Sequence, residues 1–109
     1  MSQVVPGHVF HLALASDWAA AREHGDYRIS TLGRTLEQEG FIHASREDQW
    51  RETRRRFYAD VPEELVLLEI DPALLTSELR VEEVAEAGDS FPHIYGPLNL
   101  DAVVAVHEQ

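Results

Sequence analysis

Three histidines stand in segments that are otherwise apolar and strand-like. His11, His43 and His93 each lie among Phe, Ile, Leu, Ala or Pro residues. An imidazole with a pKa of about 6.5 can donate or accept a proton near neutral pH, which suits a general acid or base. A single buried histidine is commonly a core residue that is hydrogen-bonded within the protein. Three of them in one short chain favour a shared small-molecule site.

The spacing adds a polar residue beside two of these histidines. Residues two apart in an extended segment project to the same side, so Ser45 is predicted to lie beside His43, and Tyr95 beside His93. Ser45 could instead be the N-cap of the next helix, whose first backbone N–H groups, with Arg46, would suit an anionic group. Tyr95 could instead be a core aromatic residue.

Other kinds of catalytic site find no support in the residue types. The chain has no cysteine and no lysine, which excludes thiol, disulfide and Schiff-base chemistry. No histidine pair has the four-residue spacing of a helical zinc site, and no Gly-x-Ser-x-Gly motif is present. We therefore predict no metal site and no serine hydrolase. Glu69, inside an apolar run, could orient a ligand or lie at the end of a sheet, facing water.

The elements that would position these residues follow from periodicity and from breakers. The first half is predicted to begin with a strand over 9–14, followed by a helix that is capped by Ser16 and ended by Gly25. An irregular segment with one helical turn over 35–39 comes next. A strand over 41–45 and a helix after Ser45 complete this half. In that last helix, Trp50, Thr53 and Phe57 recur at three-to-four spacing. This spacing predicts one aromatic face toward the core.

The second half of the chain is richer in strands. A nearly continuous apolar run over 65–70 predicts a central strand that is covered on both faces, and alternation over 79–84 predicts a half-exposed strand. Residues 88–98 contain two glycines and two prolines and are predicted to be broken, and a last strand is expected over 101–106. Together these elements predict one α+β domain over residues 1–109 with two main helices.

Composition and charge limit the partners. The net charge is −11, and all of it falls in residues 60–109, because the arginines and acids of residues 1–59 balance. An acidic chain repels phosphate backbones, so extended nucleic-acid binding is not expected. The arginines between 46 and 56 could hold one phosphate or form a solvated helix face. Without a secretion signal or an apolar run long enough to span a bilayer, we expect a cytoplasmic protein that does not bind membranes.

Four segments carry a resemblance to a known family. They are Phe10-His11, Glu39-Gly-Phe-Ile-His-Ala-Ser45, Leu67-Leu-Glu-Ile-Asp71 and Phe91-Pro-His-Ile-Tyr-Gly-Pro-Leu98. Together they resemble the bacterial family called domain of unknown function 952, over nearly the whole chain. That family is similar to a reduced ADP-ribosyltransferase domain, which implies a small split, antiparallel-rich sheet and NAD as a possible cofactor.

The resemblance also implies roles for particular residues. His11, on the first strand, would contact the ribose of NAD, and His43 and Ser45 would line the nicotinamide pocket. Relatives commonly carry a catalytic glutamate on a late strand, but this chain has no clear equivalent, and Glu69 and Glu82 are only candidates. Fold similarity alone is an analogy for function.

Two functional expectations result. The first is a transferase or hydrolase acting on NAD or on another nucleotide or sugar-phosphate, with these candidate catalytic residues: His11, His43, Ser45, His93 and Tyr95. A cofactor or an anionic group would be held by His11, Ser45 and Arg46. The alternative is a non-catalytic domain that binds a small molecule or a protein partner.

Overall fold

The main sheet has four antiparallel strands in the order β11-β7-β1-β6. The structure, a computed structural model, describes residues 7–109. The strands are β1 (Val9–Leu14), β6 (Ser45–Arg46), β7 (Leu65–Ile70) and β11 (Val103–Glu108). The predicted central strand over 65–70 is confirmed, because β7 lies between β1 and β11 and five of its six residues are buried. The last strand begins two residues later than predicted, after a short 3₁₀ turn at Leu100–Ala102.

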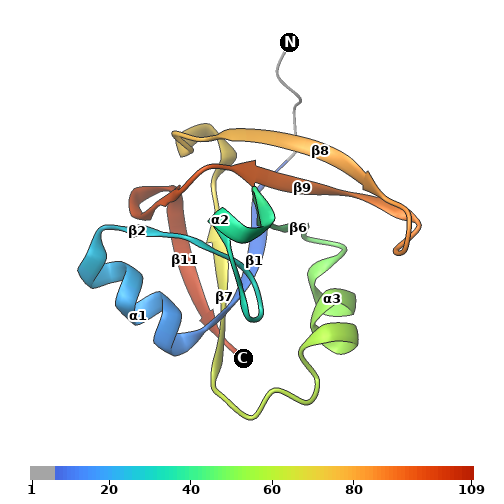
Figure 1. Cartoon of the computed structure of the whole chain (residues 1–109), viewed down its shortest axis with the longest axis horizontal. Coiled ribbons are helices and arrows are strands. Elements are labelled where there is room, and N and C mark those ends of the chain that lie inside the picture. The colour runs from blue at the N-terminus through green and yellow to red at the C-terminus, as the bar shows by residue number, and fades with distance from the viewer. Residues whose placement is uncertain (1–6) are drawn as a thin grey trace.

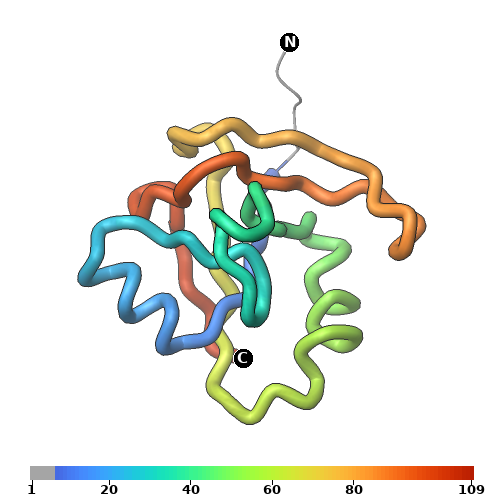
Figure 2. The backbone as a smooth tube through the Cα atoms, in the orientation of Figure 1, coloured from blue at the N-terminus to red at the C-terminus, as the bar shows by residue number. Residues whose placement is uncertain are grey.

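A second sheet of three strands crosses one end of the first (Figures 1 and 2). Its order is β5-β9-β8, with β5 (Ile42–His43), β9 (Asp89–Tyr95) and β8 (Glu78–Val84). The half-exposed strand predicted over 79–84 is confirmed by the alternating burial of β8. The break predicted over 88–98 is wrong for residues 89–95, which form β9. Pro92 lacks an N–H but is accommodated there, and its carbonyl accepts a hydrogen bond from Ala44 N at 3.0 Å.

The strand predicted over 41–45 is divided between the two sheets. Ile42 and His43 pair with β9, whereas Ser45 and Arg46 pair with β1. Ala44, between them, is fully buried and belongs to neither strand. This short segment therefore joins the sheets, and it fixes His43 where they meet.

Residues 26–40 contain three short strands and a helical turn. The strand pairs are β2 (Asp26–Tyr27) with β10 (Leu98–Asn99), and β3 (Ile29–Thr31) with β4 (Arg34–Thr35). The helical turn predicted over 35–39 is confirmed as α2 (Leu36–Glu39). Thr35 caps this turn: its hydroxyl accepts from Gln38 N, and the Gln38 side chain accepts from Thr35 N.

The two main helices flank the main sheet (Figure 1). They are α1 (Ala15–His24) and α3 (Trp50–Phe57). Gly25 ends α1 with φ 111°, as predicted, because glycine tolerates the left-handed conformation there. Both predicted N-caps are wrong: α1 begins before Ser16, and α3 begins five residues after Ser45, which lies in β6.

The core lies between the helices and the inner faces of the strands. Its fully buried large side chains include Tyr27, Ile42, Leu68, Ile70, Ile94 and Leu98. The aromatic face predicted for α3 is wrong at Phe57, which is 63% exposed, whereas Thr53 is buried. Residue 57 is the last residue of α3 and borders a cavity. The architecture is α+β with antiparallel sheets, as predicted. No helix in the described part of the chain is long and apolar enough to cross a membrane.

We expect Gly96→Ala to destabilise the fold strongly. Gly96 has φ 153°, and a methyl group on its Cα would overlap the side chain of Ser77. We expect a loss of about 2–4 kcal/mol in the free energy of unfolding, from strain and overlap together. The control is Gly33→Ala, where φ is 75° but the space is open; its loss should be about 1 kcal/mol. Equal losses in urea titrations of the two variants would exclude overlap as the cause.

Candidate functional site

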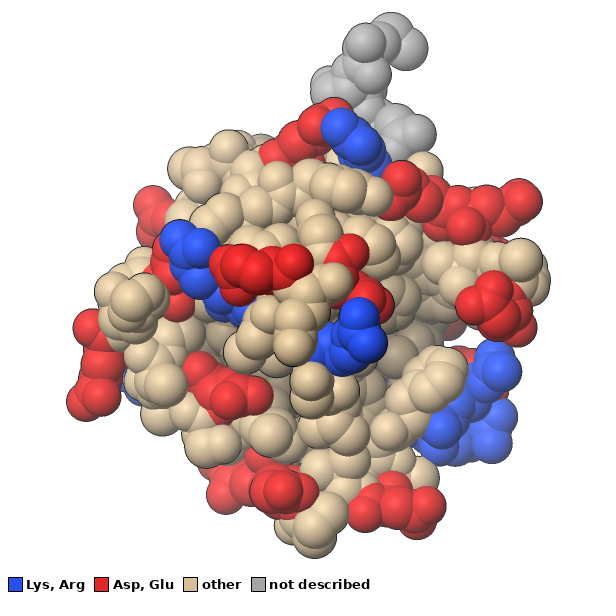
Figure 3. Space-filling model, viewed as in Figure 1, with Lys and Arg blue, Asp and Glu red and all other residues tan. Residues whose placement is uncertain are grey.

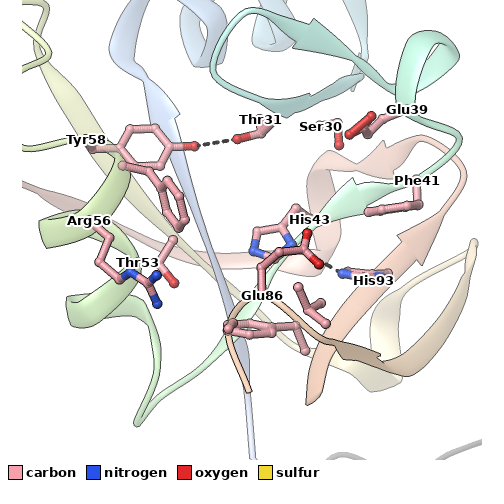
Figure 4. A pocket seen from close by; sticks show the side chains of 14 residues that line it. Ser30, Thr31, Glu39, Phe41, His43, Thr53, Arg56, Tyr58, Glu86 and His93 are labelled. Carbon is pink, nitrogen blue, oxygen red and sulfur yellow. Dashed lines mark hydrogen bonds between the residues drawn. The ribbon is translucent and has the colours of Figure 1, made fainter. Parts of the chain in front are cut away.

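A cavity of about 530 Å³ opens between α3, β3 and the β5-β9-β8 sheet. Arg56, Thr53 and Tyr58 lie on one side of it, and His43, Phe41 and His93 on the other (Figure 4). Most of the wall is apolar or aromatic, with a few polar groups, which is typical of small-molecule pockets. The complete lining is Ser30, Thr31, Glu39, Phe41, His43, Thr53, Arg56, Phe57, Tyr58, Val84, Glu86, Ala87, Phe91 and His93.

His43 and His93 are direct cross-strand neighbours. The antiparallel register of β5 and β9 pairs His43 with His93, and such pairs bring side chains together. His43 Nδ1 and His93 Nε2 are 3.2 Å apart. The Phe41 ring stacks on the His93 ring, with centroids 4.1 Å apart and an interplanar angle of 16°. The two imidazoles are therefore held as one unit in the cavity wall.

Glu82 extends this unit from β8. The Glu82 carboxylate accepts a hydrogen bond from His93 Nδ1 at 2.8 Å and another from the Tyr95 hydroxyl, so His93 and Tyr95 do project to the same side. A carboxylate can only accept, so a neutral His93 has its proton on Nδ1 and an unprotonated Nε2. His43 Nδ1 must then donate to His93. These assignments leave His43 Nε2 unprotonated and without a partner among the described residues.

His11 lies behind this pair and does not line the cavity. It is 3% exposed; its Nδ1 donates to the carbonyl oxygen of His43 at 2.5 Å, and its Nε2 accepts from the Tyr27 hydroxyl at 2.9 Å. Both ring nitrogens are therefore occupied, and no nitrogen is free for the ribose contact that the family resemblance implied. The contact with the His43 carbonyl makes His11 a support for the backbone of β5.

Burial keeps two of the three histidines neutral. The pKa of His43 is lowered to about 4, mainly by desolvation and to a smaller extent by the nearby His93 and His11. Desolvation also lowers the pKa of His11 to about 4, against a smaller opposite effect of its hydrogen bond to the His43 carbonyl. The pKa of Glu82 is lowered by its hydrogen bonds from Tyr95 and then His93. At neutral pH the unit thus contains a carboxylate and an uncharged His43.

Ser45 and Arg46 lie outside the cavity lining. Ser45 is buried, and its hydroxyl is 3.4 Å from that of Thr53, which does line the cavity. The Arg46 guanidinium is occupied by Asp48, Asp89 and the carbonyl of Ser90. Neither residue lines the cavity, and the polar groups of both are bonded within the protein, so the anion-binding role expected for them has no support in these contacts.

Glu69 makes its hydrogen bonds to residues other than His43 and His93. Its carboxylate accepts from His8 Nδ1 at 2.6 Å and from His107 Nε2 at 2.8 Å, and it lines a separate cavity of about 300 Å³ with Phe10 and Trp50. Of the two candidate late glutamates, only Glu82 contacts the histidine unit. Among residues 7–109, no group of three or more His, Asp and Glu side chains is arranged to hold a metal ion.

Sequence reasoning missed several residues of the cavity wall. Ser30 and Thr31 come from a segment that was predicted to be irregular, Tyr58 follows the last residue singled out in the predicted helix, and no periodic pattern marked any of the three. Arg56 was treated only as a member of an arginine cluster. Figure 3 shows arginine side chains gathered beside α3, on a face where acidic side chains are otherwise widespread. Phe57 was assigned to the core by its spacing, although it lies at the cavity rim.

Comparisons with known proteins agree on the fold. A family model described as "Protein of unknown function (DUF952)" matches residues 12–106. The chain is similar to protein CC0527 from Caulobacter crescentus. The crystal structure of that protein superposes with a TM-score of 0.79. The two sequences are 28% identical, and the match covers 93% of this chain and 84% of the other. Its solution NMR structure is 24% identical, with a TM-score of 0.66, over 93% and 83%. No curated protein matches.

Proposed function

This chain belongs to the protein family of unknown function DUF952, and from that premise we propose that its cavity binds a small molecule whose proton is taken up by His43. The proposal is carried by one observation, the hydrogen-bonded chain from Glu82 through His93 to His43. The series of hydrogen bonds ends at the unprotonated Nε2 of His43, a residue of the cavity wall. A carboxylate behind an imidazole holds its tautomer and stabilises the cation that forms when it accepts a proton.

The proposed role of each group follows from its place in this chain. His43 Nε2 accepts the proton of a ligand O–H or N–H, or of a water molecule that attacks the ligand. The proton on His43 Nδ1 can then pass to His93 Nε2, so that the positive charge resides next to Glu82. Tyr95 holds the Glu82 carboxylate in place. This relay offsets the weak basicity that burial gives to His43.

We place the ligand in the class of NAD, nucleotides and sugar-phosphates, and the reaction among transfers and hydrolyses. Aromatic side chains, including Phe41 and Phe91, offer faces for a planar ring, and Arg56 at the cavity rim offers a positive charge. The antiparallel α+β architecture is compatible with the implied relation to a reduced ADP-ribosyltransferase domain, which is part of this proposal. In it, Glu82 replaces the late-strand glutamate, but acts through His93.

A second candidate function is binding without turnover. It is favoured by the pKa of His43, which burial lowers to about 4 and which makes this side chain a weak base on its own. In this case His43 serves only as a hydrogen-bond acceptor for the ligand. Substitution of Glu82 by Gln separates the two functions, because it breaks a relay and leaves a binding cavity in place.

We expect NAD or ADP-ribose to raise the melting temperature of the wild-type protein. A ligand at 100 times its Kd adds about 2.7 kcal/mol to stability, which is about 10 °C for a domain of this size. The rise should vanish in His43→Ala and persist in His24→Ala, whose side chain is 72% exposed. If a panel of NAD, ADP-ribose, nucleotides and 2′-phosphorylated RNA gives no rise and no turnover, this ligand class is excluded.

A further inference from the structure

The cavity wall contains a buried hydroxyl that has no partner among the described residues. Ser30, in the middle of β3, is 0% exposed, and its Oγ makes no hydrogen bond. The same side chain lines the cavity beside which His43 and His93 lie. Buried polar groups are almost always paired, because an unpaired one lowers stability. A hydroxyl at this position therefore suits a partner that enters the cavity from outside.

The neighbouring hydroxyls do not share this property. Thr31 Oγ1 and the Tyr58 hydroxyl are paired at 3.1 Å, and Thr53 is paired with Ser45. Figure 4 shows the bond between Thr31 and Tyr58 across the cavity from His43, with Ser30 between Thr31 and Glu39 in this view. The protein thus satisfies the other hydroxyls of this wall and leaves Ser30 Oγ unsatisfied.

The surroundings of Ser30 restrict the group that it can meet. Phe41 and Phe91 supply aromatic surface in the same cavity, each packed against a histidine ring, with centroids 4.1 and 5.2 Å apart. A serine hydroxyl both donates and accepts hydrogen bonds, and it carries no charge to balance an ion. Full burial further favours an uncharged group over a charged one.

We infer that Ser30 determines ligand specificity: it hydrogen-bonds a neutral hydroxyl or amide carried by a planar ring that enters between the aromatic side chains. The inference deepens the proposed function and rests on it, because both require the ligand in this one cavity. Ser30 and the free Nε2 of His43 then provide two polar contacts, and the aromatic side chains provide the apolar ones. Together they distinguish a ring with a polar neutral substituent from a plain hydrocarbon ring.

The test compares two probes of similar shape, benzyl alcohol and toluene, by NMR titration of the backbone amides. The wild-type protein should bind benzyl alcohol more tightly than toluene. Ser30→Ala should weaken the affinity for benzyl alcohol about 3- to 10-fold, because one hydrogen bond is lost, and should leave the affinity for toluene unchanged. The melting temperature of Ser30→Ala should not fall. The control Thr31→Val, which removes a paired hydroxyl, should lower it.

Two results would overturn the inference while the proposed function stands. One is unchanged benzyl alcohol affinity in Ser30→Ala together with weakened affinity in His43→Ala. The other is a melting temperature of Ser30→Ala as low as that of Thr31→Val, which would show that the hydroxyl serves the fold. If neither probe binds the wild-type protein, or if both bind His43→Ala as they bind wild type, the inference fails, and the proposed function is decided separately by the melting-temperature panel of NAD, ADP-ribose and nucleotides.

Discussion

Lowering the pH from about 7.5 to about 5 is expected to reduce the free energy of unfolding by up to about 4 kcal/mol. His11 and His43 have pKa values of about 4 in the folded protein, against 6.5 when solvated. At pH 5 the unfolded chain therefore binds protons at both residues, and the folded protein binds almost none. Each residue contributes about 2 kcal/mol to the loss.

The direction and the window of this effect follow from the sign of the shifts. When the pKa of a histidine is lower in the folded state than in the unfolded state, the unfolded chain binds more protons between the two pKa values. The free energy of unfolding is then at its full value above about pH 6.5 and decreases as the pH falls toward about 4. Lowered carboxylate pKa values, as at Glu82 and Glu69, act below their ordinary value of 4.5, so this window isolates the histidines.

Urea titrations at the two pH values measure this loss. His43→Asn should retain about half of it, because only His11 then remains to take up a proton on unfolding. An unfolding free energy that is equal at both pH values would show that the buried imidazoles are not kept neutral by the fold.

His11→Ala is expected to reduce the free energy of unfolding by about 3–5 kcal/mol. The substitution leaves a cavity where a buried ring was, and it leaves the His43 carbonyl and the Tyr27 hydroxyl without their partners. Because this histidine supports the backbone that carries His43, the variant should also bind cavity ligands less tightly.

Two further variants calibrate this result. Tyr27→Phe removes one hydrogen bond and keeps the ring, so its loss should be about 1–2 kcal/mol. His24→Ala, on the exposed last turn of α1, should change stability by less than about 0.5 kcal/mol. If His11→Ala loses no more free energy of unfolding than His24→Ala in the same denaturation assay, His11 does not support the fold as described.

The sequence predicted those parts of the fold where one local pattern dominates. The apolar runs of β1 and β7 and the alternation of β8 allow one strand assignment each, and Gly25 marks a helix end. Local patterns failed where distant segments decide. Pro92 lies in β9 opposite Val81 although it has no N–H to donate, and Phe57 has core spacing but is 63% exposed.

The candidate site was predictable only in part for the same reason. The apolar surroundings of His43 and His93 singled out both residues, but their pairing depends on the register between β5 and β9. Glu82 was considered only as a candidate for the late-strand glutamate that the resemblance implied, since no pattern indicated that it bonds to His93. Ser30 has an ordinary sequence environment, and only its burial without a partner distinguishes it.

The stretch from Ile42 to Arg46, which pairs with both sheets, has a consequence for the order of assembly. Its pairing partners are far away in the chain: β1 precedes it, and His93 follows His43 by 50 residues. Contacts at such separation form slowly, because a long loop must first be closed. Before β9 has emerged from the ribosome, the nascent chain therefore contains His43 but has no His93 beside it. The histidine pair arises late in biosynthesis, when nearly the whole polypeptide is available to fold.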